Sequence, residues 1–495
     1  MIEKKNTYRN ILKATTIFGG VQVSSIIVSI IRSKFLAIFI GLAGYGIFSL
    51  LNSTIELVRA LTSFGLETSG VKKISEVNSI NDNRLISKNV YVILKLGLLT
   101  GILGTLTAMI FSNYLSRFSF GNSDKTIAVI LISVSILFKQ LTSSKNAIFQ
   151  GMAKLNFLAK SNLYGNIFGL IMTLPLFYIF KIDAIVPAII VTSFISFIVS
   201  VYYFKKLNIE KSSIKFNEIL IEGKDVLYFG GLLSISSFLP VLSNYLIQIF
   251  ISKNGGIELV GLFSVGLIII NSYVGILFNA MSTEYYPRLV SEISLNKNVN
   301  NSVNQQAIFS MLIIVPIIIL FFGLMPIIIK ILFTANFLEV MPFVSWAILA
   351  MFFKSFSWSM GLMIIAKADS KVFTKTSIIF NFLYLLICLY GYHFYGLEGL
   401  GIGFLLYFII HLISVFFVVK WRYGLILTNK LYIVFVICLV LCIISIVLFH
   451  ISNSWMKYIL FLITFIFSVL FAYKELMKNS DLKESLISYF NRKKK

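Results

Sequence analysis

Residues 431–449 read LYIVFVICLVLCIISIVLF, a run of nineteen positions that contains no charged side chain. A helix needs about 20 consecutive apolar residues to cross the hydrocarbon core of a bilayer, so this run is long enough to span it. Similar runs recur from residue 14 to residue 473. Strands of a membrane barrel would alternate apolar and polar side chains, and these runs do not alternate. The sequence therefore predicts an all-α polytopic membrane protein.

The composition excludes a soluble protein of this length. Of the 495 residues, 58% are hydrophobic and only 13% are charged, whereas a soluble domain has about a quarter of its residues charged. The longest connections between apolar runs, about 67–88 and 205–225, are shorter than an independent domain of at least about 50 residues. We therefore expect no soluble catalytic or nucleotide-binding domain, and we do not expect an enzyme.

The apolar runs divide into fourteen predicted membrane spans. We place them at 14–38, 45–66, 89–111, 127–149, 157–180, 183–204, 226–252, 258–283, 305–333, 341–366, 373–394, 397–419, 431–449 and 455–473.

The positive charges are distributed unevenly about these spans. With the N-terminus inside, 30 of the 43 Lys and Arg residues fall on the side of the two termini, 8 fall on the opposite side, and five lie within spans. Cytoplasmic loops carry such an excess of Lys and Arg, so both termini are expected in the cytoplasm of a bacterial cell. The net charge of +23 is then explained by contact with anionic membrane lipids, and no nucleic-acid partner is expected.

Cysteine and histidine indicate no metal site, disulfide framework or cofactor. The three cysteines, Cys388, Cys438 and Cys442, all lie in apolar spans. Coupling of the protein to membrane potential, H⁺ or Na⁺ remains open at this point.

Short sequence matches recur between the two halves of the chain at a nearly constant offset. The stretch 46–49 (GIFS) matches 261–264 (GLFS), and Phe138-Lys139 matches Phe353-Lys354. Such an offset is typical of transporters built from two related halves. Because an even number of spans separates equivalent helices, the halves are predicted to be related by a pseudo-twofold axis along the membrane normal, with a central cavity between them.

The duplication predicts the following domain organisation. Residues 1–210 form an N-terminal six-helix lobe, 211–224 a cytoplasmic linker, 225–424 a C-terminal six-helix lobe, and 425–495 two further helices with a basic cytoplasmic tail.

Two stretches carry a resemblance to a known family. They are RSKFLAIFIGLAGYGIFS from Arg32 to Ser49 and GMAK from Gly151 to Lys154. With the span number and lobe spacing, the chain resembles the bacterial polysaccharide repeat-unit flippases of the multidrug/oligosaccharidyl-lipid/polysaccharide exporter superfamily. The resemblance implies an alternating-access carrier that moves undecaprenyl-diphosphate-linked oligosaccharides, such as O-antigen or capsule repeat units, to the outer leaflet. It also implies a polysaccharide polymerase and chain-length machinery as partners.

Polar residues within the spans fall on single helical faces, which indicates a lined cavity because a polar group facing lipid is costly. In the first span, Gln22 and Arg32 lie with Ser25 and Ser29 within an arc of about 80°. In the second span, Asn52 shares a face with Glu56 and Arg59, which lie one turn apart and can pair.

The fourth span places Lys139 on one face with Asn146, and Lys354 occupies the repeat-equivalent position in the tenth span. Two such lysines on either side of a pseudo-twofold axis predict a clamp for an anion such as a diphosphate. The alternative is that they reach the membrane interface, or pair with a carboxylate on another helix such as Glu56 or Glu284. The position equivalent to Arg32 is about Gln248, which shares a polar face with Asn244.

We therefore predict substrate contacts from Gln22, Arg32, Asn52, Arg59, Lys139, Asn146, Asn244, Gln248 and Lys354, with Glu56 and Glu284 as candidates for ion coupling. A multidrug or organic-cation antiporter of the same superfamily is the alternative function, because it would use such carboxylates. A flippase for the peptidoglycan lipid precursor is a second alternative.

Overall fold

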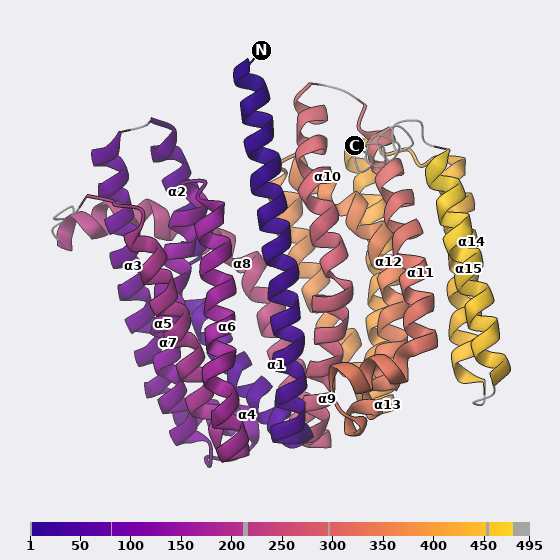
Figure 1. Cartoon of the computed structure of the whole chain (residues 1–495), viewed down its shortest axis with the longest axis horizontal. Helices are drawn as coiled ribbons and strands as arrows, with labels where there is room; N and C mark the ends of the chain where they lie inside the picture. The colour runs from indigo at the N-terminus through magenta and orange to yellow at the C-terminus, as the bar shows by residue number, and fades with distance from the viewer. Residues whose placement is uncertain (1, 81, 211–215, 296–297, 452–454, 479–495) are drawn as a thin grey trace. The chain divides into compact units, whose positions relative to one another are not determined.

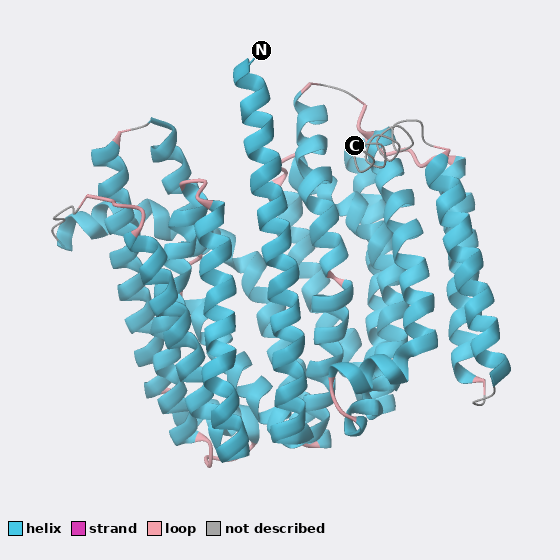
Figure 2. Ribbon diagram, in the orientation of Figure 1, coloured by secondary structure: helices cyan, strands magenta, loops and turns pink. Residues whose placement is uncertain are grey.

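The chain was analysed as a computed structural model, which describes residues 2–80, 82–210, 216–295, 298–451 and 455–478. Every regular element in these ranges is a helix, and most connections between helices are short (Figure 2). Residues 211–215 of the predicted linker and 479–495 of the predicted basic tail lie outside the described residues.

The α-helices follow one another along the chain in this order: α1 (Ile2–Thr62), α2 (Leu66–Ile80), α3 (Asn83–Ile110), α4 (Ser112–Phe120), α5 (Thr126–Gly151), α6 (Leu155–Phe180), α7 (Ile185–Lys205), α8 (Phe216–Gly255), α9 (Ile257–Leu267), α10 (Ile276–Ser294), α11 (Asn300–Leu332), α12 (Met341–Ala366), α13 (Ser370–Tyr423), α14 (Asn429–His450) and α15 (Trp455–Met477).

Eleven helical segments among the described residues are long and apolar enough to cross a membrane. Three of them contain a break and so provide two spans each, which gives the fourteen spans expected from the sequence. The breaks lie at Gly41 in α1, at Gly396 in α13, and at Lys181 between α6 and α7, and all three residues have positive φ. The predicted all-α polytopic fold is confirmed.

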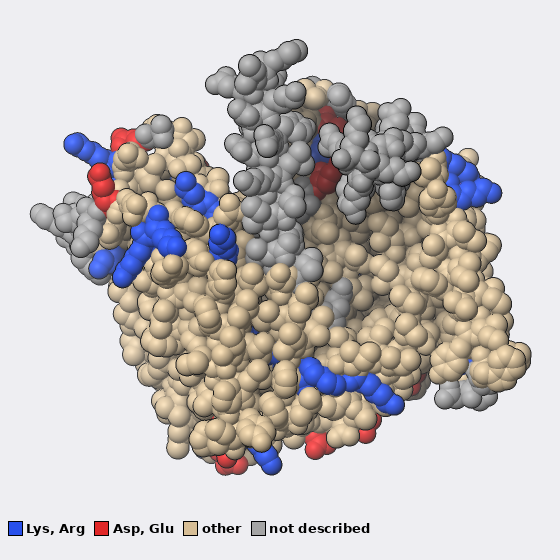
Figure 3. All heavy atoms as spheres, in the orientation of Figure 1, with Lys and Arg blue, Asp and Glu red and all other residues tan. Residues whose placement is uncertain are grey.

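The surface of the membrane-spanning part is mostly uncharged. On the face drawn in Figure 3, the region over α3, α5, α6 and α7 is a broad tan band, and the Lys, Arg, Asp and Glu side chains lie mainly near the two ends of these helices. This distribution fits helices whose middle sections face hydrocarbon, where an exposed charge is expensive.

Packing divides the chain into two compact units, which we describe separately. Unit 1 comprises residues 1–264 and 331–337, and unit 2 comprises 265–330 and 338–495. In unit 1, α5 packs on α3 and α7, and α1 packs on α6 and α8. In unit 2, α12 packs on α13, and α14 lies beside α15 (Figure 1). The lobe boundaries predicted from the sequence repeat remain a prediction.

Residues 331–337 belong to unit 1 because they contact its first helix. The ammonium group of Lys34 donates a hydrogen bond to the backbone carbonyl of Phe333. The ring of Tyr45 packs edge-on against Phe333 and Phe337, with centroid distances of 6.2 and 5.8 Å.

Residues with positive φ recur along the chain at the same spacing as the sequence matches. Gly41 and Gly256 both have positive φ, as do Ala153 (φ 55°) and Ala368 (φ 52°), and Lys181 is matched by Gly396. The two members of each pair are separated by the same length of chain. Positive φ is uncommon for residues other than glycine, so its recurrence at Ala153 and Ala368 is specific. These matches support an internal duplication.

Equivalent residues of the two repeats also contact each other within unit 1. A Cβ atom on Gly46 would lie 2.0 Å from the carbonyl oxygen of Ile257, and one on Gly261 would lie 2.5 Å from that of Leu42. The two contacts are copies of one another because Leu42 and Ile257, like Gly46 and Gly261, are related by the repeat spacing. Reciprocal contacts of this kind, in which residue i contacts j and the equivalent of j contacts the equivalent of i, are typical of interfaces with twofold symmetry.

The same interface is extended by a hydroxyl pair. Ser49 and Ser264, which are related by the same spacing, lie with their Oγ atoms 2.6 Å from each other. The GIFS stretch of α1 and the GLFS stretch of α9 therefore pack against each other within unit 1.

We expect Gly46→Ala to lower the thermal stability of the protein, because the new methyl group overlaps the Ile257 carbonyl and forces the helices apart. Overpacking of this kind costs about 1–3 kcal/mol. The measurement is thermal unfolding of detergent-purified protein followed by intrinsic fluorescence. Gly231→Ala is the matched control, because no atom of the described part of the chain lies within 4 Å of the added atom. Equal melting temperatures for the two variants would contradict close packing at this interface.

Candidate functional site

Several of the polar residues predicted from the sequence lie together inside unit 1, where α1, α5, α6 and α7 line two cavities. The smaller cavity has a volume of about 160 Å³ and the larger one about 450 Å³. Both receive side chains from all four helices. The helices can supply polar groups here because each carries them on one face of an otherwise apolar sequence.

The smaller cavity is cationic. Arg32 from α1 and Lys139 from α5 line it, together with Asn52 from the second half of α1. The Arg32 Nη2 atom donates a hydrogen bond to the backbone carbonyl of Asn166, at 3.4 Å. In the described part of the structure, the Arg32 guanidinium forms no ion pair with a carboxylate. The rest of the lining is apolar or hydroxylic: Leu36, Phe48, Thr173, Phe177, Ala188, Ile189, Thr192 and Ser193.

Glu56 joins two of the cations beside this cavity. Its Oε2 atom accepts from Nε of Arg59 at 2.8 Å, and its Oε1 atom accepts from Nζ of Lys139 at 2.8 Å. The predicted pairing of Glu56 with Arg59 is confirmed. Lys139 adopts the alternative that the sequence left open, a pair with a carboxylate on another helix.

This network retains an excess of positive charge. Arg32, Arg59 and Lys139 are three cations, and Glu56 is one carboxylate. Glu67 also acts electrostatically on Arg59, and the cations remain in excess when it is included. The side chains of Glu56, Arg59 and Lys139 are 35%, 25% and 25% exposed, so water or a bound molecule can reach them.

The larger cavity is polar, and none of the described residues that line it is a Lys or an Arg. Amide groups and hydroxyl groups from α1, α5, α6 and α7 line most of it: Asn146, Gln150, Asn162, Asn166, Ser25, Thr142, Ser161 and Ser196. Glu67 from α2 is its one charged lining residue among the described residues. The Nδ2 atom of Asn146 donates to Oδ1 of Asn162 at 3.2 Å.

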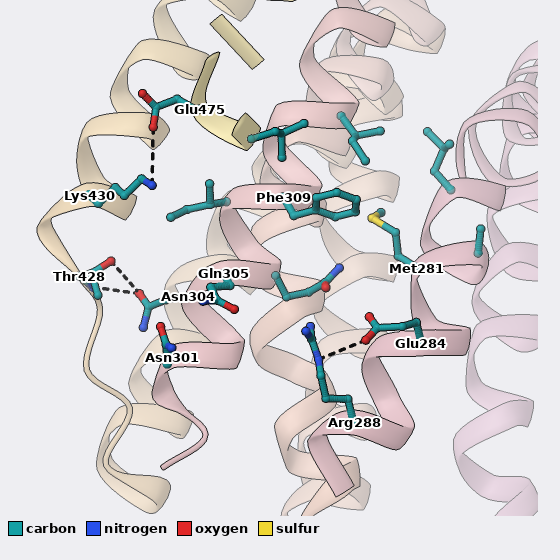
Figure 4. Close-up of a pocket in the computed structure, with 16 residues that line it drawn as sticks. Met281, Glu284, Arg288, Asn301, Asn304, Gln305, Phe309, Thr428, Lys430 and Glu475 are labelled. Carbon is teal, nitrogen blue, oxygen red and sulfur yellow. Dashed lines mark hydrogen bonds and ion pairs between the residues drawn. The ribbon is translucent and has the colours of Figure 1, made fainter. Parts of the chain in front are cut away.

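Two predicted residues lie in unit 2. The ammonium nitrogen of Lys354 lies 5.4 Å from the ring centroids of both Phe278 and Phe408, which is a cation–π arrangement, and no carboxylate pairs with it among the described residues. Glu284 forms an ion pair with Arg288 at 3.3 Å in a cavity of about 750 Å³ lined by α10, α11, α14 and α15 (Figure 4). The clamp between Lys139 and Lys354 remains a prediction.

The remaining predicted residues are Asn244 and Gln248 on α8 and Gln22 in the first half of α1. Gln248 is buried, and its Oε1 atom has no hydrogen-bond partner among the described residues. Asn244 lies one turn before it on the same helix. Gln22 falls within α1, but its side chain lies outside the described part of the structure.

Sequence reasoning missed the contribution of α6. Asn162 and Asn166 line the larger cavity, and Thr173 lines the smaller one. Their spacing of four and eleven residues places them on one face of the helix, so the same stripe analysis would have found them. The large cavity of unit 2 was also missed, because its polar residues, including Asn301 and Gln305, precede the apolar part of α11.

Comparisons with known proteins agree with this architecture. A family model described as "Polysaccharide biosynthesis protein" matches residues 35–342, which is more than half of the chain. A search of curated proteins finds no significant match.

Several solved structures share the fold at low sequence identity. A structure of the lipid II flippase MurJ in an inward closed conformation matches at 15% identity, covering 94% of this chain and 99% of that one, with a TM-score of 0.72. A mutant of the Vibrio cholerae MATE transporter VcmN matches at 15% identity, covering 87% and 100%, with a TM-score of 0.61. A MOP superfamily transporter from Pyrococcus furiosus matches at 16% identity, covering 83% and 96%, with a TM-score of 0.56. These similarities establish the fold.

We expect Glu56→Gln to destabilise the protein more than Lys139→Met does. The first change leaves two partly buried cations without a carboxylate, whereas the second leaves the Glu56–Arg59 pair intact. Removing one partner of a fully buried pair costs about 3–5 kcal/mol, and the partial exposure here reduces this to about 1–3 kcal/mol.

Melting temperatures of the purified variants measure this difference. Glu76→Gln is the control, because Glu76 pairs with Lys72 at 3.8 Å with both side chains more than half exposed, and such pairs contribute little. If Glu56→Gln melts like Glu76→Gln, Glu56 does not hold the cations together.

Proposed function

Because the chain belongs to the polysaccharide biosynthesis protein family, we propose that it is an alternating-access flippase for undecaprenyl-diphosphate-linked oligosaccharide repeat units. It carries them from the cytoplasmic to the outer leaflet of the bacterial cytoplasmic membrane for synthesis of a surface polysaccharide such as O-antigen or capsule. The protein is a multi-pass membrane transporter of the MOP superfamily fold.

The observation that carries the proposal is the cationic network beside the smaller cavity of unit 1. Arg59 and Lys139 pair with the Glu56 carboxylate, and Arg32 lines the same cavity as Lys139, all within the membrane-spanning helices. A diphosphate presents several charged oxygens, and charge-assisted hydrogen bonds from Arg and Lys are about twice as strong as neutral ones. A cavity with excess positive charge therefore favours an anionic head group over a cationic molecule.

Glu56 gives this network a way to bind and release its cargo. In the empty site, the Glu56 carboxylate lowers the cost of keeping Lys139 and Arg59 inside the membrane. A diphosphate that enters the cavity competes with Glu56 for the same donors. Release of Glu56 from its partners frees it to accept a proton, which is how H⁺ would couple to transport.

The membrane potential favours outward movement of an anionic cargo. With the cell interior negative by about 100 mV, outward movement of one negative charge gains about 2.3 kcal/mol. The potential therefore favours export of an anionic lipid, provided that the cations of the protein move less than the cargo.

The pairing of Glu56 and Glu284 with cations supports the antiporter alternative less well than the flippase. An organic cation needs a carboxylate that is free to bind it, yet Glu56 is engaged by Arg59 and Lys139, and Glu284 pairs with Arg288. A peptidoglycan-precursor flippase would use the same diphosphate chemistry, so it differs from the proposal in the sugars it carries.

We expect Arg32→Gln and Lys139→Gln each to reduce translocation of undecaprenyl-diphosphate-linked oligosaccharide at least tenfold, because one lost charge-assisted hydrogen bond is worth about 1.5–3 kcal/mol. The assay uses proteoliposomes in which the fluorescently labelled oligosaccharide is accessible to a membrane-impermeant quencher only after it has been flipped.

Arg117→Gln removes the same charge from an exposed position on α4 and serves as the matched control, with an expected parental rate. Parental rates in the Arg32 and Lys139 variants would reject the cationic site. Efflux of ethidium by the parent protein, without oligosaccharide translocation, would support the antiporter in its place.

A further inference from the structure

The two cavities of unit 1 are stacked along the same helices. On α1, Ser25 lines the larger cavity and Arg32 lines the smaller one, and on α5 the corresponding residues are Asn146 and Lys139. Both steps are seven residues, or about 10.5 Å along a helix. On α6, Asn166 and Thr173 repeat the step. If a molecule binds with its charged group in the smaller cavity, the group attached to that charge lies beside the larger cavity.

The chemistry of the larger cavity differs sharply from that of its neighbour. Amide and hydroxyl groups can each donate and accept hydrogen bonds, and they dominate its lining. An apolar prenyl chain would leave these groups unsatisfied, and a phosphate would find no cation among the described lining residues. A sugar ring, which carries several hydroxyl groups in fixed directions, satisfies both kinds of group.

Two residues that line this cavity each carry a buried polar atom without a hydrogen-bond partner among the described residues. The Oδ1 atom of Asn146 and the Oγ atom of Ser161 are inaccessible to bulk solvent and form no hydrogen bond among the described residues. Asn146 is already oriented, because its Nδ2 atom donates to Asn162. Most buried polar atoms in proteins are hydrogen-bonded, so two unpaired polar atoms on residues that line one cavity indicate a bound partner that the described residues do not supply.

Glu67, the one carboxylate among the described residues that line the larger cavity, disfavours a negatively charged ligand. Glu67 is exposed at the larger cavity and accepts a hydrogen bond from the Ser143 hydroxyl at 3.0 Å. It can accept further bonds from sugar hydroxyl groups, whereas the carboxylate of an acidic sugar would be repelled.

We infer that the larger cavity is a carbohydrate subsite that binds the sugar next to the diphosphate and selects an uncharged sugar over an acidic one. The inference rests on the proposed function, because the cationic cavity anchors the diphosphate that positions the sugar. Arg32 and Lys139 determine whether the lipid binds, and Asn146, Ser161 and Glu67 determine which sugar it carries.

The test compares three lipids that share the same anchor. Full-length protein in nanodiscs is titrated with undecaprenyl diphosphate, with the same lipid bearing one N-acetylglucosamine, and with the same lipid bearing one glucuronate. We expect the parent protein to bind the N-acetylglucosamine lipid about tenfold more tightly than the bare lipid, because two hydrogen bonds are added. The glucuronate lipid is expected to show no such gain.

The double variant Asn146→Leu with Ser161→Ala is expected to lose the tenfold preference while keeping the parental Kd for the bare lipid. Asn113→Leu with Ser123→Ala is the matched control on exposed positions of unit 1 and should keep the preference. If the double variant does not fold, Asn162→Leu, at an exposed position on the same cavity, takes its place. Glu67→Gln is expected to improve binding of the glucuronate lipid severalfold.

The outcomes separate this inference from the proposed function. Equal affinity of the parent protein for the bare and N-acetylglucosamine lipids would overturn the carbohydrate subsite and leave the flippase proposal intact, provided that Arg32→Gln weakens both. Failure of the parent protein to bind any of the three lipids would overturn both. Unchanged discrimination in Glu67→Gln would overturn the selection by charge.

Discussion

The pairing of charged side chains inside apolar helices is the constraint on which the site depends. A lysine or arginine within the hydrocarbon region costs several kcal/mol unless it is paired or reaches water. The Glu56 carboxylate offsets this cost for two cations, because it lies 2.8 Å from Arg59 on its own helix and 2.8 Å from Lys139 on α5. The network ties α1 to α5 and still leaves positive charge available to an anion. The stability of the protein and the proposed binding of an anion therefore both depend on Glu56.

The internal duplication imposes a second constraint, which is close backbone packing between equivalent residues of the two repeats. Backbone conformations that interrupt helices recur at the repeat spacing, and equivalent residues meet where α1 packs on α9. The close approach of Gly46 to Ile257 and of Gly261 to Leu42 requires that both glycines lack a side chain. The shared geometry of the two repeats is thus maintained by backbone packing, even though their polar side chains differ: Arg32 has no basic counterpart near Gln248.

That difference allows the two units to carry different chemistry. Unit 1 has cations and amides on neighbouring levels of one helix bundle. In unit 2, Lys354 lies near two phenylalanine rings, and the Glu284–Arg288 pair lines a cavity whose walls combine apolar side chains with amide and charged groups. The proposed cargo, a lipid-linked oligosaccharide, has a charged group, a polar chain and an apolar tail, and two units of different chemistry would suit such a molecule.

The sequence by itself determined the membrane class, the fourteen spans, the repeat period and the face of each helix that carries polar groups, because these follow from hydropathy and from periodicity along one helix. It also predicted the Glu56–Arg59 pair, which is local. The tertiary structure alone decided that Lys139 pairs with Glu56, that the face of α6 with Asn162 and Asn166 lines the same cavity as α1 and α5, and that a polar cavity adjoins a cationic one. These features depend on which helices pack together and at what height, and side-chain spacing within a single helix contains no information about its neighbours.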